Sequence, residues 1–172
     1  MKIVFLGTGG TYPSKVRNVT SIAVQMPGEV LMFDCGEGTQ RQLMRSSVSF
    51  MRIRRIFISH LHADHFLGLA GLVQSMSLNG RETDLHVFGP EGTCTTVCSM
   101  LQLGYFKCGF KVLGTDLAPG ATLDLGNYLV RSVAAEHSVP ALAYSVEEKP
   151  RPGRFDLRKA KRLGIPEGPL YR

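Results

Sequence analysis

The sequence predicts a single layered α/β domain. Short apolar runs with strand character alternate with segments in which apolar residues recur at helical spacing. The chain has 172 residues, of which 44% are hydrophobic, and this is enough for one domain with a buried core. Polar residues capable of chemistry follow directly after several of the strand-like runs. This placement is typical of α/β folds, which gather ligands and substrates at one edge of a sheet.

The first part of the chain is predicted to contain four strands and one helix. The strands are Lys2 to Leu6, Thr20 to Met26, Val30 to Phe33 and Arg55 to Ile58. A polar loop from Gly7 to Asn18 separates the first two. Pro27-Gly28 is a turn signal between two apolar alternations and therefore predicts a hairpin. The segment from Glu37 to Arg45 is typical of a helix.

The second part continues the alternation. A helix is predicted behind the fourth strand, with an apolar face made of Phe66, Leu69, Leu72, Val73 and Met76. Beyond it we expect a strand from Leu85 to Phe88, a helix from Thr93 to Leu103, and strands from Tyr128 to Ala134 and from Ala141 to Val146. No internal repeat or low-complexity tract interrupts this order.

The four cysteines and the hydropathy pattern indicate a cellular setting. Cys35, Cys94, Cys98 and Cys108 form no Cys-x-x-Cys pair and are too few for a disulfide scaffold, so we expect buried thiols in a reducing compartment. Cys94 and Cys98 could share a helix face and hold a metal, but core packing is the favoured interpretation. No apolar run is long enough to cross a membrane, and strand-like residues begin at Ile3. The expected location is cytoplasmic, without a membrane partner.

Positive charge is concentrated in two regions, within a formal net charge of +6. Five arginines and no acidic residue lie between Arg41 and Arg55. Residues 147–172 hold eight lysines and arginines against four acidic residues. Such surfaces bind phosphate backbones through counterion release, so a nucleic acid or another polyanion is a natural partner. The alternative is a solvated face that only confers solubility.

The segment from Ser59 to His65 reads Ser-His-Leu-His-Ala-Asp-His and predicts a metal site. In an extended segment side chains alternate, so His60 and His62 point the same way, and the turn that follows brings Asp64 and His65 toward them. Converging nitrogen and oxygen ligands suit zinc or a similar first-row divalent metal. A solvated loop with accidental histidines is the alternative, but three of the five histidines in the chain lie in this segment.

His137 is the fourth candidate ligand among the histidines. It follows a predicted strand, 72 positions after His65, and its loop should lie at the same edge of the fold. His86 is left out of the site. It lies inside the predicted strand from Leu85 to Phe88, where an outward-facing or hydrogen-bonded histidine is the simpler interpretation.

These residues and several other segments resemble a known family. His60 to His65 is similar to the His-x-His-x-Asp-His signature of metallo-β-lactamase hydrolases. A narrower resemblance is to the ribonuclease Z family, which trims the 3′ trailer from tRNA precursors. In chain order it is carried by Leu6-Gly7-Thr8-Gly9, Pro13-Ser14-Lys15-Val16-Arg17-Asn18, Phe33 to Gln40, Phe57-Ile58-Ser59-His60 and Phe88-Gly89-Pro90. The stretch from Gly164 to Pro169 is similar to part of that family's protruding tRNA-binding arm.

The resemblance implies a fold and a division of the chain. The expected fold is the αββα sandwich of the metallo-β-lactamase family, here the first lobe plus the start of the second. Residues 1–146 would form the N-terminal lobe and the first strands of the second lobe. Residues 147–172 would begin the basic tRNA-binding arm.

The resemblance also implies roles for individual residues. Two zinc ions are expected in a complete site, the first held by His60, His62 and His137, while Asp64 and His65 would begin the second. Asp64 would be both a ligand and the general base. The expected substrate-binding residues are Lys15, Arg17 and Asn18 near the cleaved bond, and Gly164, Pro166, Gly168 and Pro169 in the arm.

In the family an aspartate and a histidine located beyond the arm complete the two metal sites. They do not occur before Arg172, so the resemblance implies an N-terminal fragment that is inactive alone. The expected function of the whole protein is a zinc-dependent endoribonuclease acting on precursor tRNA, usually as a homodimer. Two alternatives are a small-molecule phosphodiesterase or thioester hydrolase of the same fold, and a non-catalytic RNA-binding remnant.

Overall fold

The computed structural model describes residues 1–150, 153, 155–166 and 168. The elements are, in chain order, β1 (Lys2–Gly7), β2 (Ser21–Gln25), β3 (Val30–Phe33), α1 (Thr39–Arg45), η1 (Phe50–Arg52), β4 (Ile53–Phe57), α2 (Ala63–Phe66), α3 (Gly68–Leu78), β5 (Leu85–Gly89), α4 (Thr93–Leu101), β6 (Val112–Asp116), β7 (Thr122–Asp124), β8 (Tyr128–Ala134), β9 (Leu142–Glu148) and α5 (Leu157–Arg162). All the predicted strands and helices are therefore confirmed, with boundaries that differ by a few residues.

The strands form two sheets. The larger sheet has the order β1-β2-β3-β4-β5-β6, and the smaller one has the order β7-β8-β9. β2 and β3 pair antiparallel around a turn in which Gly28 has φ 93°, so the predicted hairpin is confirmed. From β3 to β6 the neighbouring strands are parallel. Their carboxyl ends consequently meet at one edge of the sheet, and the loops that leave this edge can share a site.

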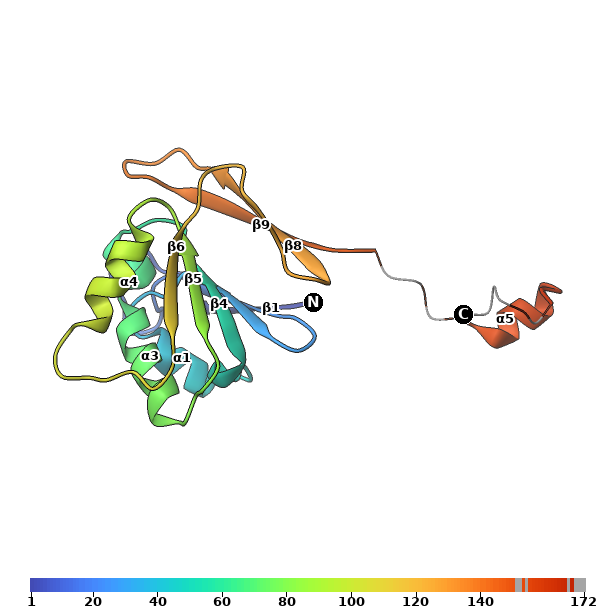
Figure 1. The fold of residues 1–172 in the computed structure, drawn as a ribbon, viewed down its shortest axis with the longest axis horizontal. Coiled ribbons are helices and arrows are strands. Elements are labelled where there is room, and N and C mark those ends of the chain that lie inside the picture. Colours follow the sequence, from blue (N-terminus) through green and yellow to red (C-terminus); the bar gives the residue numbers. More distant parts are fainter. Residues whose placement is uncertain (151–152, 154, 167, 169–172) are drawn as a thin grey trace.

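The layers follow from which faces are apolar. Helices α1, α3 and α4 cover one face of the larger sheet, the smaller sheet covers the other, and α5 lies away from both (Figure 1). Among the described residues the order is helices, sheet, sheet, which corresponds to three of the four layers of the predicted αββα sandwich. The fold class is mixed α/β, as predicted.

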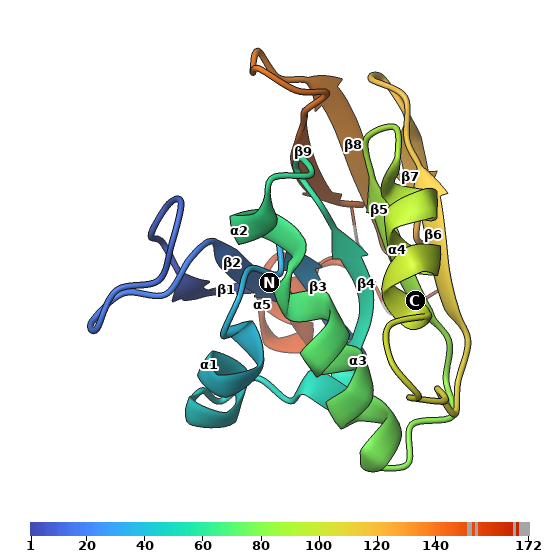
Figure 2. The same ribbon diagram turned by 90° about the vertical axis from the view of Figure 1, so that its left-hand side faces the viewer.

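The core between helices and sheet contains the apolar face that the sequence predicts for α3, which runs along the sheet in Figure 2. Leu69, Leu72, Val73 and Met76 are each at most 1% exposed. They recur at spacings of three and four because residues at these spacings share one face of a helix with 3.6 residues per turn.

Aromatic rings fill the space between the two sheets. Phe57 stacks on Phe33 and on Phe88, each at 5.2 Å between ring centroids, and Tyr144 of β9 packs against Phe57 at 5.3 Å. The hydroxyl group of a buried tyrosine usually needs a hydrogen-bond partner. Tyr144 donates a hydrogen bond to the Ile58 carbonyl oxygen at 2.8 Å, so the smaller sheet is attached to the segment that follows β4.

Four elements were not predicted, namely η1, β6, β7 and α5. β6 and β7 alternate only between exposed and half-buried residues, and α5 is exposed except for Ala160, so these three elements have little hydrophobic periodicity to detect. None of the helices in the described ranges has the length and apolar character needed to span a bilayer.

The expectation that all four cysteines are buried is wrong. Cys35 is buried and Cys108 is half-buried, but Cys94 and Cys98 are exposed. The reason is the orientation of α4, which buries Thr93 and Val97 against the sheet. The cysteines follow these residues by one position each, and a step of one residue rotates a side chain by about 100° around the helix.

Candidate metal centre

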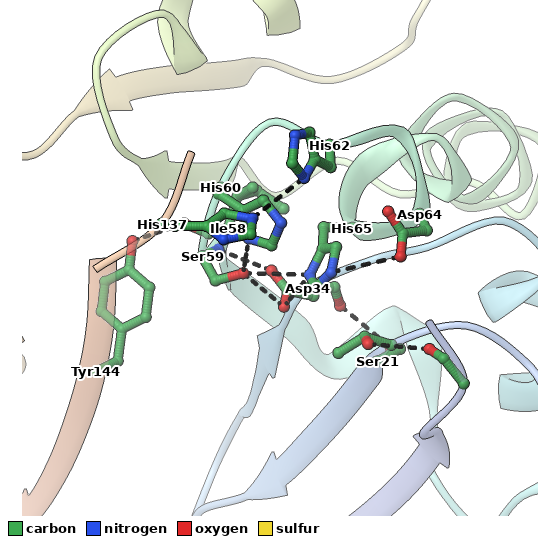
Figure 3. A network of polar contacts seen from close by, with 12 residues as sticks. Ser21, Asp34, Ile58, Ser59, His60, His62, Asp64, His65, His137 and Tyr144 are labelled. Atoms are coloured by element: carbon green, nitrogen blue, oxygen red, sulfur yellow. Dashed lines mark hydrogen bonds and ion pairs between the residues drawn. The ribbon is translucent and has the colours of Figure 1, made fainter. Parts of the chain in front are cut away.

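The Ser59–His65 segment leaves the carboxyl end of β4 and leads into the short helix α2. β4 lies between the parallel strands β3 and β5, so the segment emerges in the middle of the edge where strand ends meet. Figure 3 shows its histidines together with His137 and Asp34, which come from distant parts of the chain. The predicted position of the site is therefore the position of this cluster.

Three of the predicted ligands meet in one group. Their ligand atoms all lie within 4.8 Å of one another, and the group consists of His60, His62 and His137. His137 Nε2 is 3.2 Å from His62 Nδ1, and the His60 ring centroid is 4.4 Å from that of His137. Ligand atoms of a tetrahedral zinc with Zn–N bonds of about 2.0–2.1 Å lie roughly 3.3 Å apart, so the donor set and its spacing fit such an ion.

His137 reaches the other two imidazoles because the smaller sheet is attached to the motif. The Leu142 backbone N–H donates to the Ser59 carbonyl oxygen at 2.8 Å, and His60 forms an isolated antiparallel bridge with Ala141. These bonds fix the loop between β8 and β9, which carries His137. The site is thus assembled from both sheets.

Asp64 and His65 form a second pair beside the three imidazoles. Asp64 Oδ2 lies 3.6 Å from His65 Nε2 and accepts a hydrogen bond from the Thr11 backbone N–H at 2.6 Å. The His65 ring centroid is 3.9 Å from that of His60. Thr11 has φ 66°, in the left-handed region, and this conformation accompanies the contact of its N–H with the carboxylate.

Asp34 contacts the candidate site and was not among the residues predicted for it. It follows β3, its side chain is 8% exposed, and it receives three hydrogen bonds. These come from the Ser59 N–H at 2.7 Å, the Ser59 hydroxyl at 2.9 Å and His65 Nδ1 at 2.7 Å. With the proton on Nδ1, His65 presents the lone pair of Nε2 toward Asp64, which is the arrangement common for metal-binding histidines.

The electrostatics of the cluster favour a neutral His60 and an ionised Asp64, whereas burial alone would lower the pKa of His65 but Asp34 and Asp64 outweigh it and raise that pKa. Burial, together with the neighbouring His65 and His137, lowers the pKa of His60 to about 4. Burial alone would raise the pKa of Asp64, but the Thr11 N–H and His65 outweigh it and hold that pKa below its usual range. Neutral histidine and ionised aspartate are the forms that bind metals, so His60 and Asp64 are in the required protonation states.

Two glycines allow the backbone around the site to pack closely. A Cβ on Gly36 would lie 2.1 Å from the Asp64 carbonyl oxygen, and a Cβ on Gly68 would lie 2.1 Å from the Gly36 carbonyl oxygen. The loop after β3 and the start of α3 are therefore in direct backbone contact. The Cys35 backbone N–H donates to the His65 carbonyl oxygen at 2.7 Å and strengthens this contact.

The predicted substrate residues fall into two separate places. Lys15 and Arg17 are exposed in the loop before β2, while Asn18 donates to the Glu37 carbonyl oxygen at 2.9 Å and fixes that loop to the start of α1. Gly164, Pro166 and Gly168 lie beyond the end of α5, the helix that Figure 1 shows away from both sheets, and Pro169 lies outside the described residues. His86 lies in β5 and outside the metal cluster, as expected.

The chain is similar to known proteins in both sequence and structure. Residues 1–104 match the family model described as Anti-Pycsar protein Apyc1. Ribonuclease Z of Methanosarcina mazei is 48% identical over 171 residues, which are 99% of this chain and 56% of that protein. The crystal structure of the short form of human tRNase Z has 34% identity and a TM-score of 0.79, covering 87% of this chain and 64% of that chain.

The metallo-β-lactamase fold protein YhfI from Bacillus subtilis superposes with a TM-score of 0.65 at 21% identity, covering 84% of this chain and 56% of that chain. This similarity concerns the fold alone. The chain spans about half the length of the curated relatives that it matches.

Proposed function

The chain belongs to the family described as Anti-Pycsar protein Apyc1, and we propose that its protein is a zinc-dependent endoribonuclease that removes the 3′ trailer from tRNA precursors. Its curated relatives are ribonucleases Z, and its structural relatives have the metallo-β-lactamase fold. The observation that carries the proposal is the meeting of His60, His62 and His137 next to the pair Asp64 and His65. A mixed set of imidazoles and a carboxylate at a sheet edge suits metal-assisted hydrolysis of a phosphodiester.

The proposed first zinc ligands are His60, His62 and His137, and Asp64 and His65 begin the second site. When bound, such ions lower the pKa of water and neutralise the charge that grows on phosphoryl oxygens. His65 is oriented by Asp34, whose carboxylate accepts its Nδ1 proton at 2.7 Å. This contact leaves Nε2 free to act as a ligand.

Asp64 is the proposed general base as well as a ligand. Its lowered pKa keeps it ionised near neutral pH, so it can accept a proton from the attacking water. The Thr11 N–H orients the same carboxylate through Oδ2. Lys15 and Arg17, both exposed in the adjacent loop, are proposed to donate hydrogen bonds to phosphate oxygens of the RNA.

The basic arm is proposed to bind the folded tRNA away from the cleaved bond. α5 carries Arg158, Lys159, Lys161 and Arg162, and recognition by such a surface depends on the shape and backbone of the RNA. We also propose that the whole protein is a homodimer and acts in the cytoplasm. Residues 1–146 are proposed to be its N-terminal lobe with the first strands of the second lobe, and residues 147–172 the start of the arm.

Trailer cleavage by the full-length protein tests the proposal. We expect Asp64→Ala to remove cleavage, because the variant lacks both a ligand and the base, while Asp84→Ala in an exposed loop keeps parental activity. Metal analysis should find zinc in the parent and less zinc in the Asp64 variant. Unchanged cleavage by Asp64→Ala would contradict the assigned role.

Two further measurements on the same protein, tRNA binding at low salt and hydrolysis of a small ester, distinguish the two alternatives. A protein that does not bind tRNA at low salt but hydrolyses a small ester would be a small-molecule hydrolase of this fold. A protein that binds tRNA without cleaving any phosphodiester would be an RNA-binding protein. Either result would refute the proposed activity.

A further inference from the structure

We propose that a cavity between the 13–18 loop and α1 binds the phosphodiester backbone of single-stranded RNA beside the cleaved bond, with Arg41 and Arg45 as positioning residues. The proposal rests on the proposed function and extends its binding surface to a helix not yet given a role. The cavity, called the basic cavity below, has a volume of about 340 Å³. It is lined by Pro13, Ser14, Lys15, Val16, Arg17, Asn18, Glu37, Gly38, Arg41, Gln42 and Arg45.

Four cations surround this cavity and their charges are not neutralised by the protein. Lys15 and Arg17 lie on the loop side, and Arg41 and Arg45 lie on the helix side. Across the ranges that the structure describes, no carboxylate is within ion-pairing distance of any of the four. Glu37 is the one acidic residue in the lining, so the cavity keeps an excess of three positive charges. Such an excess favours an anionic ligand.

The helix side is arranged for a chain of phosphates. Arg41 and Arg45 are four residues apart on α1, so their side chains lie on the same face, about 6 Å apart at the Cβ atoms. Both are exposed, and a guanidinium group can donate two parallel hydrogen bonds to one phosphate. Two arginines at this spacing can therefore bind neighbouring phosphates of one strand.

The lining argues against a small-molecule site. Sites for small molecules are mostly apolar with a few polar groups, whereas Pro13 and Val16 are the only apolar side chains in this lining. A ligand here is recognised through its charge, and the bases of an RNA strand can remain in solvent.

The basic cavity borders a second cavity that reaches Asp64. A smaller cavity of about 140 Å³, lined in part by Thr11 and Asp64, shares Pro13 and Glu37 with it. A strand whose phosphate lies at Asp64 can therefore pass along this wall toward the arginines of α1.

The loop between the two cavities is fixed at both ends. The Thr11 N–H donates to Asp64 at 2.6 Å, and the Asn18 side chain donates to the Glu37 carbonyl oxygen at 2.9 Å. Within the loop, the Ser14 N–H donates to the Arg17 carbonyl oxygen at 2.8 Å. The backbone that carries Lys15 and Arg17 is therefore attached to both the metal centre and α1, which reduces the entropy cost of ordering the loop when a strand binds.

The test compares four forms of the full-length protein: the parent, R41A/R45A, R41K/R45K and the control R52A. Arg52 is an exposed arginine of η1, at the opposite end of β4 from the metal centre. Two measurements are made. Cleavage of precursor tRNA gives kcat and KM, and fluorescence anisotropy of chelator-treated protein gives the affinity for the same RNA over a range of salt concentrations. Circular dichroism confirms that each variant is folded.

We expect R41A/R45A to raise KM about tenfold with little change in kcat, because the lost contacts bind substrate without touching the reacting atoms. The slope of log affinity against log salt should decrease by roughly 1.4, at about 0.7 per phosphate contact with a single strand. R41K/R45K should restore the slope but only part of the affinity, since lysine keeps the charge and loses the fork. R52A should behave like the parent.

The results separate this inference from the proposed function. A parent that cleaves and binds precursor tRNA, together with an R41A/R45A variant of unchanged KM and salt slope, would overturn the role of the basic cavity alone. A parent that neither binds nor cleaves precursor tRNA would overturn both. An equal loss in R52A would show general electrostatic attraction and would also overturn the assignment.

Discussion

The conversion of Asp34 to asparagine tests whether this buried carboxylate determines the protonation of His65. Asp34 accepts hydrogen bonds from the Ser59 N–H, the Ser59 hydroxyl and His65 Nδ1. In Asp34→Asn the amide oxygen can keep the first bond, but the amide NH2 then faces His65 Nδ1. The imidazole must accept at Nδ1 and carry its proton on Nε2, where it cannot be a ligand.

The contacts of Asp34 indicate how much the substitution should weaken metal binding and how much it should lower the stability of the metal-free protein. Loss of a contact that orients a metal-binding histidine weakens metal affinity by about 10–100-fold. Two of the three bonds lose their charged acceptor, so contacts worth about 1.5–3 kcal/mol each become neutral contacts worth about 0.5–1.5 kcal/mol. His65 is only 16% exposed, so solvent screens these contacts weakly, and we expect about 2–3 kcal/mol less stability in the metal-free protein.

Zinc titration against a competing chelator measures the first effect, and urea unfolding of the metal-free protein measures the second. Asp84→Asn is the matched control, because it makes the same chemical change in an exposed loop. A folded Asp34→Asn protein that binds zinc with parental stoichiometry and affinity would refute the role of Asp34 in orienting His65.

Three further predictions concern packing, thiols and phenols. Gly36→Ala should lower the free energy of unfolding in urea by about 3 kcal/mol, because the added Cβ would lie 2.1 Å from the Asp64 carbonyl oxygen. Gly10→Ala, with open space around it, should change this free energy by less than about 0.5 kcal/mol. Equal values for the two variants would contradict the packing argument. A thiol reagent should modify Cys94 and Cys98 rapidly in the folded protein, and it should reach the buried Cys35, whose pKa is raised by burial, only after unfolding. The variant C94S/C98S should therefore lose the rapid phase of thiol modification, and C35S should keep it. Burial raises the pKa of Tyr144, and burial with the hydrogen bond to Glu29 raises that of Tyr128. The stability that these neutral phenols contribute is complete below about pH 10 and is lost as the pH rises through their pKa in the folded protein. In an absorbance titration of tyrosinate, Tyr144→Phe should therefore remove ionisation that the parent shows only at the highest pH. A titration identical to that of the parent would contradict this.

The sequence predicted the regular elements and the histidine cluster because both leave local patterns. Leu69, Leu72, Val73 and Met76 recur at helical spacing, and His60 and His62 are two positions apart. The contact of Asp34 with His65 spans 31 positions, and it exists only because β3 and β4 are neighbours in the sheet. No local pattern records such a contact.

The other features that could not be predicted from the sequence also depend on tertiary contacts and not on a local pattern. Thr11 acts through its backbone N–H, which has no dependence on the identity of its side chain. The exposure of Cys94 and Cys98 follows from the rotation of α4 against the sheet, and two thiols at helical spacing suit a core and a surface equally well. Tertiary contacts decided these features.

Thr11 and Asp34 are the two described residues other than glycine that have positive φ, at 66° and 58°. Each such conformation stores strain of about 1–3 kcal/mol, and for a β-branched threonine it is a true outlier. Both residues direct hydrogen bonds at the Asp64–His65 pair, so part of the conformational stability of this lobe is given up to preorganise its reactive groups. Selection for greater thermal stability should therefore favour glycine at position 11, which keeps the N–H, and should not tolerate it at position 34, where the carboxylate itself is needed.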